Sequence, residues 1–418
     1  MAYRATEPHY RLNTRLQPRL QVLYLTCHLP FPPHSGGRLR DAELIRHLAE
    51  QVDIHLCVVS KTYELDSTHL SEAQRYCRSV SMLAAEPIEN GEVSDKVRRH
   101  RCPDMISLMA TLRRTVAIDL IHVEGYYLMQ HVPVGVTVPV FLGTQNIEYL
   151  LDEQRSALSL PGADVLPESA RRAEETAWSR ADGYGAVSHD DLIHLRHHTG
   201  VPGTWWTPNG SDHLSGEDAE HPLPELGDRL SVLYLANFGY QPSSDAARLL
   251  CERIWPFVHA QVPHAQLILV GANPPDWLWT YAARDPSVTV TGPVASVSPW
   301  LRRSDVVLAP LRIGGGVKVK ILEAITAGCA VVTTPVGVQG LPSEVRDAMV
   351  VVSTDGDAAR STIALLQSPE RRRSLRTAAR RAARLLPTWS RAACLLHDAW
   401  LATLAQARVH RDGHERAE

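Results

Sequence analysis

The sequence predicts an α/β protein with two doubly wound parallel-sheet halves in tandem, and three observations support this fold class. The chain has 418 residues, which is too many for a single hydrophobic core. Short apolar runs alternate with segments of helical periodicity, which indicates βαβ units and parallel sheets buried on both faces. A polar stretch, residues 204–228, interrupts this alternation, which then begins again.

The first half, residues 21–203, begins with a buried strand over 21–29 that a cluster of prolines ends. Gly36 and Gly37 then predict a tight loop, and residues 39–49 carry the periodicity of a helix. Further apolar runs predict strands at 53–60, 117–125 and 138–146.

The second half, residues 229–387, repeats the pattern with a helix over 243–258. Its apolar runs predict strands at 231–239, 265–273, 287–294, 304–311 and 329–337. Residues 388–418 form an amphipathic helix and tail with no strand to follow, and we expect the helix to cross back and brace the first domain. Residues 1–20 are expected to be an N-terminal arm. Because ligands bind beyond the carboxyl ends of parallel strands, two facing sheets predict a cleft between the domains.

Composition narrows the class of function. The chain is 44% hydrophobic and 21% charged, which is typical of a soluble globular protein. A net charge of −3 argues against nucleic acid as a main partner. The seven scattered cysteines form no C-x-x-C pair, so neither a disulfide framework nor a zinc site is indicated. No apolar run approaches the roughly 20 residues that cross a bilayer, and no signal-peptide core is present. A reducing, cytoplasmic location is therefore expected.

The most informative stretch is "LRIGGGVKVKILEAITAGCAVV", residues 311–332. The chain has only four lysines, and Lys318 and Lys320 lie here beside three glycines. The glycines let the backbone approach a ligand, and a helix beginning near Val317 would point free N–H groups at it. With these two lysines and Arg312, the stretch suits a diphosphate. Glu323, one turn further on, could accept hydrogen bonds from a ribose diol.

An ordinary surface helix would explain the same residues without a ligand. In that interpretation the glycines form a turn, and Lys320 and Glu323 form an i,i+3 ion pair. The concentration of scarce lysines favours the sugar-nucleotide pocket.

The segment "APLRIGGGVKVKILEAITAGCAVVTTPVGVQGL" resembles the donor-site signature of family 4 glycosyltransferases. These are retaining enzymes of the glycogen phosphorylase/glycosyltransferase superfamily with the two-domain GT-B fold. The sequence is most similar to the subset that has PLRxGGG before KILEA. The stretches "PPHSGGRLRDAELIRHL", "RADGYGAVSHDDLIHLR" and "TPNGSD" resemble further family motifs in the family's order. The resemblance covers residues 20–400 approximately.

The resemblance implies roles for the second-domain residues. Glu323 corresponds to the second glutamate of the family's E-x7-E pair, near the nucleotide ribose. The first glutamate would fall at Gly315 and is absent, so backbone N–H groups from Gly314, Gly315 and Gly316 to Val317 would contact the donor. The family's usual Arg/Lys pair after the first strand of this domain is also missing. Lys318, Lys320 and Arg312 are then the candidates that neutralise the leaving diphosphate.

In the first domain, the resemblance places Gly36 and Gly37 against the donor from the opposite wall. Asn146, with Gln145, stands where many relatives carry a histidine, and it would offer an amide to the sugar; a plain strand-end turn is the alternative. Glu124 and Glu148 are expected to be solvated loop residues or acceptor contacts.

The implied reaction is a retaining transfer from a nucleoside-diphosphate sugar, with UDP as the default base, to a hydroxyl acceptor. The acceptor would be a natural product or a cell-envelope or polysaccharide intermediate. No cofactor or metal is expected, because the single D-x-D, Asp355-Gly356-Asp357, lies where aspartate commonly serves as a turn or cap residue. A phosphate oxygen of the leaving group would take the acceptor proton.

Three alternatives remain open. An inverting GT-B enzyme would use His28 as the base. A nucleotide-sugar epimerase or an inactive binding relative would share the scaffold. The basic segment 371–389 is either a solvated helix face or a weak contact with anionic membrane lipid. The sequence leaves the oligomeric state open.

Overall fold

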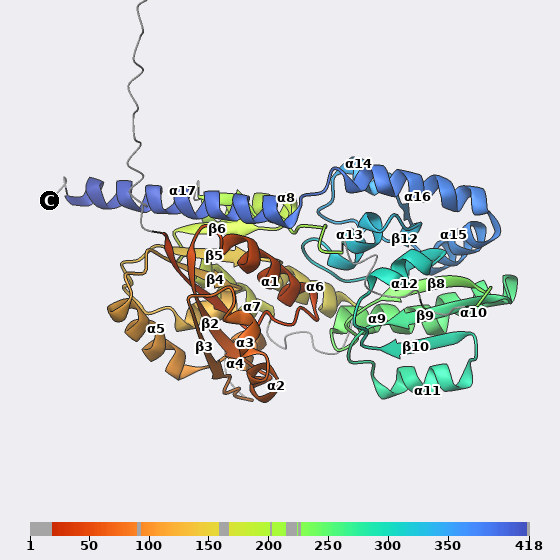
Figure 1. Cartoon of the computed structure of the whole chain (residues 1–418), viewed down its shortest axis with the longest axis horizontal. Helices are drawn as coiled ribbons and strands as arrows, with labels where there is room; N and C mark the ends of the chain where they lie inside the picture. The colour runs from red at the N-terminus through yellow and green to blue at the C-terminus, as the bar shows by residue number, and fades with distance from the viewer. Residues whose placement is uncertain are drawn as a thin grey trace, which may run out of the picture.

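The computed structural model describes residues 19–89, 93–158, 167–200, 203–214, 224 and 227–415. Two parallel β-sheets, each flanked by helices, form two Rossmann-like domains side by side, which confirms the predicted fold class (Figure 1). Residues 1–18 of the predicted arm, most of the linker after residue 214 and the last three residues lie outside the described part of the chain.

Within the described residues, the first sheet has seven strands in the order β3-β2-β1-β4-β5-β6-β7, and all its paired strands run parallel. Residues 22–25 of the central strand are fully buried, since β1 has neighbours on both sides and helices over both faces. The strands are β1 Gln21–Thr26, β2 Asp53–Ser60, β3 Ser79–Ala84, β4 Leu120–Glu124, β5 Val140–Thr144, β6 Gly183–Ala186 and β7 Thr204–Trp206.

Helices fill the connections between these strands. They are α1 Gly36–Leu48, α2 Tyr63–Ser67, α3 Leu70–Ala73, α4 Asp95–Arg99, α5 Pro103–Thr115, the 3-10 helix η1 Tyr126–His131, α6 Glu148–Ala157, α7 Pro167–Trp178 and α8 His189–Thr199.

The second sheet has six strands among the described residues, in the order β10-β9-β8-β11-β12-β13, again all parallel. Its strands are β8 Leu230–Leu235, β9 Ala265–Val270, β10 Val288–Gly292, β11 Val306–Ala309, β12 Val331–Thr333 and β13 Val350–Val351. Its helices are α9 Gln241–Leu249, the π-helix η3 Leu250–Ile254, α10 Trp255–Gln261, α11 Asp276–Arg284, α12 Ser298–Arg303, α13 Val319–Thr326, α14 Ser343–Arg346, α15 Asp355–Gln367 and α16 Pro369–Ala383.

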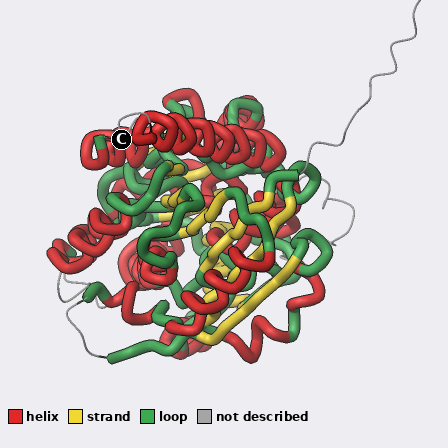
Figure 2. The backbone as a smooth tube through the Cα atoms, turned by 90° about the vertical axis from the view of Figure 1, so that its left-hand side faces the viewer, coloured by secondary structure: helices red, strands yellow, loops and turns green. Residues whose placement is uncertain are grey.

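The last helix, α17 Trp389–Glu415, leaves the second domain and lies along the first (Figures 1 and 2). It contacts α1, β6 and β7. Trp389 and Trp400 are fully buried in the core that β1 and α1 also form. The crossover helix therefore contributes part of the first domain's hydrophobic core.

Local structure differs from the sequence predictions in two places. Gly36 and Gly37 are the first residues of α1 and not a loop before it, because Ser35 caps the helix by accepting a hydrogen bond from the N–H of Arg38. The segment expected to open the linker starts instead with β7, the edge strand of the first sheet.

Each sheet has a switch point where the strand order reverses, between β1 and β4 in the first sheet and between β8 and β11 in the second. Ligands of such sheets bind beyond the carboxyl ends of the strands at this point. The loop from β1 to α1, the loop after β4 and the glycine loop after β11 all begin there.

Candidate functional site

Two helix N-termini, from α1 and α13, meet between the two sheets. Gly36 opens α1 and Val319 opens α13, and a Cβ added to Gly36 would lie 3.3 Å from Cγ2 of Val319. Lys318 holds the cap position of α13. The first-turn N–H groups of a helix have no acceptor within that helix, and the positive ends of both helix dipoles point into the junction. The junction can therefore bind an anion between the two domains.

The glycine loop before α13 packs directly against the loop that follows β5. Gly316 has a φ of 54°, and a Cβ there would lie 2.1 Å from the carbonyl oxygen of Gln145. A Cβ on Gly315 would lie 2.9 Å from Oδ1 of Asn146. With its amide nitrogen turned toward Gly315, Asn146 lies 3.0 Å from the Gly315 carbonyl oxygen. These glycines therefore permit close approach between the domains.

The outer residues of the same loop also have protein partners. The N–H of Gly314 donates to Oε1 of Gln154, which belongs to α6 of the first domain, at 3.1 Å. Val317 is half-buried, and a Cβ on Gly340 would lie 2.9 Å from its Cγ2. The sequence predicts that the N–H groups of Gly314, Gly315 and Val317 contact a donor. In the structure the N–H of Gly314 has a first-domain partner, and Gly315 meets Asn146 through its carbonyl oxygen.

Lys318 turns its ammonium group into the protein. Its Nζ donates to the carbonyl oxygen of Gly316 at 3.1 Å and to Oε1 of Gln339 at 3.0 Å. Burial lowers the pKa of Lys318 to about 7, although the charge of Asp191 opposes this shift.

Lys320 is held by hydroxyl groups. Its Nζ donates to the hydroxyl groups of Tyr234 at 3.3 Å and Ser243 at 3.2 Å, and it lies 4.7 Å from the centre of the Tyr234 ring. Burial lowers the pKa of Lys320 to about 8, with Glu323 opposing the shift. Among the described residues, neither Lys318 nor Lys320 forms an ion pair with a carboxylate. A bound anion would therefore supply the charge partner that both lysines lack.

Arg312 does not join the two lysines. Its guanidinium forms a bidentate ion pair with Asp245, with distances of 3.0 and 2.5 Å. The carboxylate raises the pKa of Arg312 and compensates its charge. The prediction that Arg312 neutralises a diphosphate would require this pair to break.

Glu323 is fixed by residues outside its own domain. Its Oε1 lies 3.1 Å from Nε2 of His213, in the segment that joins the domains. Nε1 of Trp389, the first residue of α17, donates to Nδ1 of the same histidine at 3.2 Å. The N–H of Trp389 also donates to Asp212 at 2.7 Å. The two chain segments that connect the domains, one around His213 and one around Trp389, are thus bonded to each other, and His213 also bonds to Glu323.

A cavity of about 300 Å³ opens at the switch point of the first sheet. Its walls come from the ends of β1, β4 and β5 and the start of α6, and the second domain contributes Tyr240. The lining residues are Thr26, Cys27, His28, Gly37, Glu124, Gly125, Tyr126, Tyr127, Thr144, Gln145, Asn146, Glu148, Glu174 and Tyr240. We call this cavity the first-domain pocket. It lies next to the start of α1, which contributes Gly37 to its lining.

His28, the alternative catalytic base, lies in this pocket. Its Nε2 is 3.2 Å from Oδ2 of the buried Asp41 and its Nδ1 is 3.3 Å from Sγ of Cys27. Burial opposes ionisation, yet Cys27 and Asp41 together raise the pKa of His28 well above its usual value. The imidazole is therefore held as a cation at neutral pH.

Glu124 is buried and not a solvated loop residue, which corrects the sequence expectation. It accepts from Nε2 of His122 at 2.8 Å and from Nε2 of Gln145 at 3.0 Å, and its Oε1 lies 3.4 Å from Nε of Arg40. Burial opposes its ionisation, but His122 and Arg40 lower the pKa of Glu124 to about 2. His122 and Glu124 are polar residues inside an otherwise apolar strand, and that anomaly was the available sequence signal for this network.

Two further glutamate side chains meet at the start of α6, one from α6 itself and one from α7. Glu148 forms an ion pair with Lys96, so it too is engaged within the protein. Glu174 of α7 accepts from the N–H groups of Glu148 at 3.1 Å and Tyr149 at 3.0 Å. Burial and the charge of Glu148 raise the pKa of Glu174 to about 8. No sequence signal indicated Glu174, because its partners lie about 25 residues earlier in the chain, in α6.

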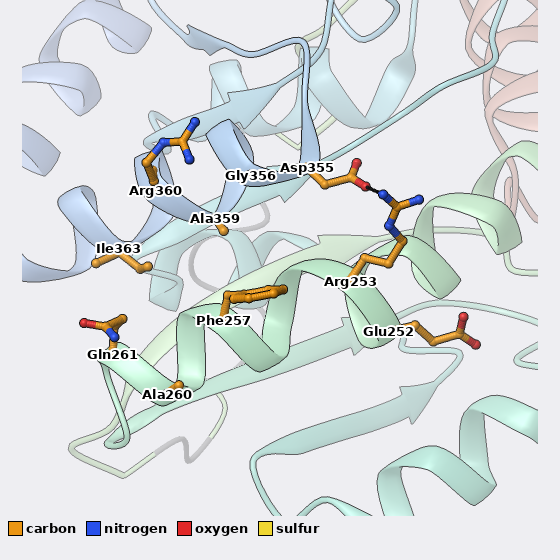
Figure 3. Close-up of a pocket in the computed structure, with 10 residues that line it drawn as sticks. All are labelled: Glu252, Arg253, Phe257, Ala260, Gln261, Asp355, Gly356, Ala359, Arg360 and Ile363. Atoms are coloured by element: carbon orange, nitrogen blue, oxygen red, sulfur yellow. Dashed lines mark ion pairs between the residues drawn. The ribbon is translucent and has the colours of Figure 1, made fainter.

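The D-x-D motif lies at the start of α15, next to a different cavity of about 640 Å³ that none of the predicted donor residues lines (Figure 3). Thr354 caps this helix, so the cap is the threonine before the motif and not an aspartate. Asp355 forms an ion pair with Arg253 at 2.9 Å, and Asp357 pairs with Arg360 at 2.6 Å. Over the described residues, no three His, Cys, Asp or Glu side chains gather as metal ligands.

The basic segment forms α16 and the turn after it. Several of its arginines are exposed, namely Arg371, Arg373, Arg380, Arg381 and Arg384. Arg372 and Arg376 instead bond to backbone carbonyls of the second domain. No helix among the described residues is long and apolar enough to cross a membrane.

Comparison with known proteins agrees with this architecture. Residues 229–368 match the family model described as "Glycosyl transferases group 1". No curated protein matches the sequence significantly. Sucrose-phosphate synthase from Thermosynechococcus elongatus has a similar structure, with a TM-score of 0.70 and 18% identity, covering 93% of this chain and 100% of that chain.

Two other solved structures are similar over nearly their full lengths. WaaG, a glycosyltransferase involved in lipopolysaccharide biosynthesis, has a TM-score of 0.64 and 14% identity, covering 89% of this chain and 97% of its own. Anabaena HepE in complex with UDP has a TM-score of 0.61 and 12% identity, covering 92% of this chain and 100% of its own. Likeness at these identities shows the fold. Residues 229–368 of the second domain thus match a glycosyltransferase family model, and the whole chain has the two-domain GT-B fold of these structures.

Proposed function

We propose that the chain is a retaining, metal-independent glycosyltransferase of family 4. It would move a sugar from a nucleoside-diphosphate sugar to a hydroxyl of a natural product or of a cell-envelope intermediate. The group 1 match of the second domain supports the activity. The similarity to HepE, whose structures include complexes with UDP and with UDP-glucose, supports UDP as the first nucleotide to test.

One observation carries the proposal: the N-termini of α1 and α13 meet beside two lysines that form no ion pair with a carboxylate of the described part of the chain. A diphosphate at this junction would accept hydrogen bonds from the first-turn amides of both helices. It would also supply the negative charge that Lys318 and Lys320 lack, and their pKa values would rise on binding. Glu323, held by His213, lies one turn along α13 and would accept hydrogen bonds from the ribose hydroxyls.

The chemistry follows from this placement. As the bond between sugar and diphosphate breaks, negative charge grows on the phosphate oxygens, and fixed amides and ammonium groups stabilise it. The close contact between the glycine loop and the loop after β5 would exclude water from the reacting sugar. An acceptor in the first-domain pocket would transfer its hydroxyl proton to a leaving phosphate oxygen, so no protein base is needed.

The inverting alternative requires His28 to accept a proton. His28 is instead held as a cation between Cys27 and Asp41, which makes it a poor base at neutral pH. NMR of the product's anomeric configuration separates the two mechanisms: retention supports the proposal, and inversion would overturn it.

Thermal shift with nucleotides tests the donor site, because a ligand that binds the native state raises its stability by mass action. UDP, GDP and their sugars should raise the melting temperature of the wild-type chain. Lys318→Ala and Lys320→Ala should weaken this shift, and Arg371→Ala, which removes an exposed cation from α16, should leave it unchanged. The absence of any shift with nucleoside diphosphates would refute the proposal. Turnover of a nucleotide sugar without an acceptor would point to an epimerase.

A further inference from the structure

Cys27 differs from the other cysteines in its neighbours. It follows β1 at the floor of the first-domain pocket, where its Sγ lies 3.3 Å from Nδ1 of His28 and 3.4 Å from the hydroxyl oxygen of Tyr127. Five of the remaining cysteines, Cys57, Cys77, Cys102, Cys251 and Cys329, are buried, and burial raises the pKa of each thiol. Cys27 is half-buried and lies in a cavity that a small molecule could enter.

A second histidine faces the same sulfur. The ring of His100 stacks on that of Tyr127 with centroids 4.3 Å apart, and its Nδ1 lies 2.7 Å from the carbonyl oxygen of Lys96. His100 is 5% exposed, and its Nε2 has no hydrogen-bond partner among the described residues. With a proton on each ring nitrogen, Nδ1 donates to that carbonyl oxygen and Nε2 could donate a hydrogen bond to the thiolate.

Asp41 lies close to His28 and forms an ion pair with it, although Nε2 of His28 makes no hydrogen bond within the described residues. The carboxylate is fully buried and accepts hydrogen bonds from Thr26 at 2.6 Å and Tyr24 at 3.1 Å, and it lies 3.2 Å from Nε2 of His28. Cys27, His28 and Asp41 thus form a row in which a buried carboxylate stabilises an imidazolium, and the imidazolium stabilises a thiolate.

The charges around the sulfur favour the ionised form. Burial alone would raise the pKa of Cys27, but His28 and His100 together lower it well below its usual value. The titratable groups that face this site from the surrounding elements are His28, Lys61, Lys96, His100, Glu124, Tyr127 and Glu148. Tyr127 is kept protonated, since burial and the charge of Cys27 raise its pKa.

We propose that Cys27 is a modification site, a thiolate that small electrophiles and peroxides reach through the first-domain pocket. With hydrogen peroxide, the sulfur attacks one oxygen, a sulfur–oxygen bond forms and the oxygen–oxygen bond breaks. The sulfur is oxidised to a sulfenic acid by two electrons, and the departing hydroxide takes the proton of the His28 imidazolium and leaves as water. The new group projects into the cavity. This chemistry goes beyond sugar transfer and does not depend on it.

Alkylation of the wild-type chain with iodoacetamide tests the proposal, with each cysteine peptide followed by mass spectrometry. A cysteine in a short unstructured peptide, measured alongside, should react about tenfold faster per pH unit below its pKa of about 8.5. The rate at Cys27 should change less than about twofold between pH 6.5 and 8.5, because the reactive thiolate is already formed. After exposure to peroxide, dimedone should label Cys27 as its sulfenic acid. Reduction with dithiothreitol between the peroxide and dimedone steps should prevent this labelling.

Two variants sharpen the test. His28→Asn should restore the steep pH dependence at Cys27, which a purely structural role for His28 would not do. Cys394→Ser, which removes the other half-buried cysteine, should leave the Cys27 profile unchanged. A tenfold rise per pH unit at Cys27 in the wild-type chain, or no labelling of Cys27 in the folded protein, would overturn the proposal, whether or not the chain transfers sugars.

Discussion

Replacing Gly316 with alanine tests whether the two domains must approach each other at backbone distance. Gly316 has a φ of 54°, and a Cβ there would lie 2.1 Å from the carbonyl oxygen of Gln145. A real Cβ essentially never comes closer than 3.0 Å to such an atom, so the two loops would have to separate by about 0.9 Å. The left-handed backbone adds a strain of about 1 kcal/mol for any residue other than glycine.

Gly200 offers a matched control. It has a φ of 63° at the end of α8, and a Cβ there would meet no atom within 4 Å. Gly200→Ala therefore introduces the same backbone strain without the overlap. Both variants should lower stability by about 1 kcal/mol, seen as a shift of a few degrees in the melting temperature. Any further loss in Gly316→Ala reports on the contact between the domains.

The assay is the rate of sugar transfer, or of nucleotide-sugar turnover, by both variants. A displacement of about 1 Å at a reacting site can cost about 100-fold in rate, so kcat/KM should fall up to that much in Gly316→Ala. Gly200→Ala should keep wild-type kcat/KM. Equal kinetics in the two variants would show that close approach at Gly316 plays no part in catalysis, and the closed arrangement would lose its assigned role.

Three other predictions concern the two lysines, His213 and the D-x-D motif. The pKa values of Lys318 and Lys320 are lowered to about 7 and 8, so both side chains are charged below pH 7 and lose protons above it. Calorimetry should therefore show the affinity for UDP falling from pH 7 to 9, with proton uptake on binding, and Lys318→Met should flatten this pH profile. His213→Ala should leave Glu323 without its partner and raise the KM for the donor about tenfold, equivalent to roughly 1.4 kcal/mol, while an unchanged KM would separate the histidine from donor binding. Activity should persist in EDTA and in Asp355→Asn, and restoration by Mg²⁺ or Mn²⁺ after chelation would contradict the metal-independent mechanism.

Most strands that could be predicted from sequence are buried, and β10, which was also predicted, is only partly buried. β1, β2, β4 and β5 and the matching strands of the second half are continuous apolar runs, because parallel strands covered on both faces have no polar side. β3 is half-buried, and its residues Ser79–Ala84 alternate only weakly in polarity. β6 contains two glycines and β7 has three residues, so neither had a clear pattern. Their place in the sheet depends on pairing with strands distant in sequence, which local propensity does not encode.

For the site, residue types were more predictable than their partners. The sequence indicated lysines and a carboxylate near one helix start, and the structure places them there. The sequence could not show that Arg312 forms an ion pair with Asp245, which lies 67 residues earlier in the chain. Nor could it show that His213 and Trp389 reach Glu323, since they belong to segments that meet only when α17 crosses back onto the first domain.

Gly315 stands where the resemblance to family 4 implies a glutamate, and the structure gives a physical reason for the glycine. A Cβ at Gly315 would overlap the side chain of Asn146, which stands where many relatives are expected to carry a histidine. With its amide turned toward Gly315, Asn146 spans the domains at 3.0 Å and occupies the space a glutamate would need. The two departures from the pattern that the resemblance implies therefore fit each other: a glycine leaves out a side chain, and Asn146 fills the space. Under the proposed function, the amide of Asn146 would stand nearest the donor sugar, at the position where the resemblance implies a glutamate side chain from the second domain.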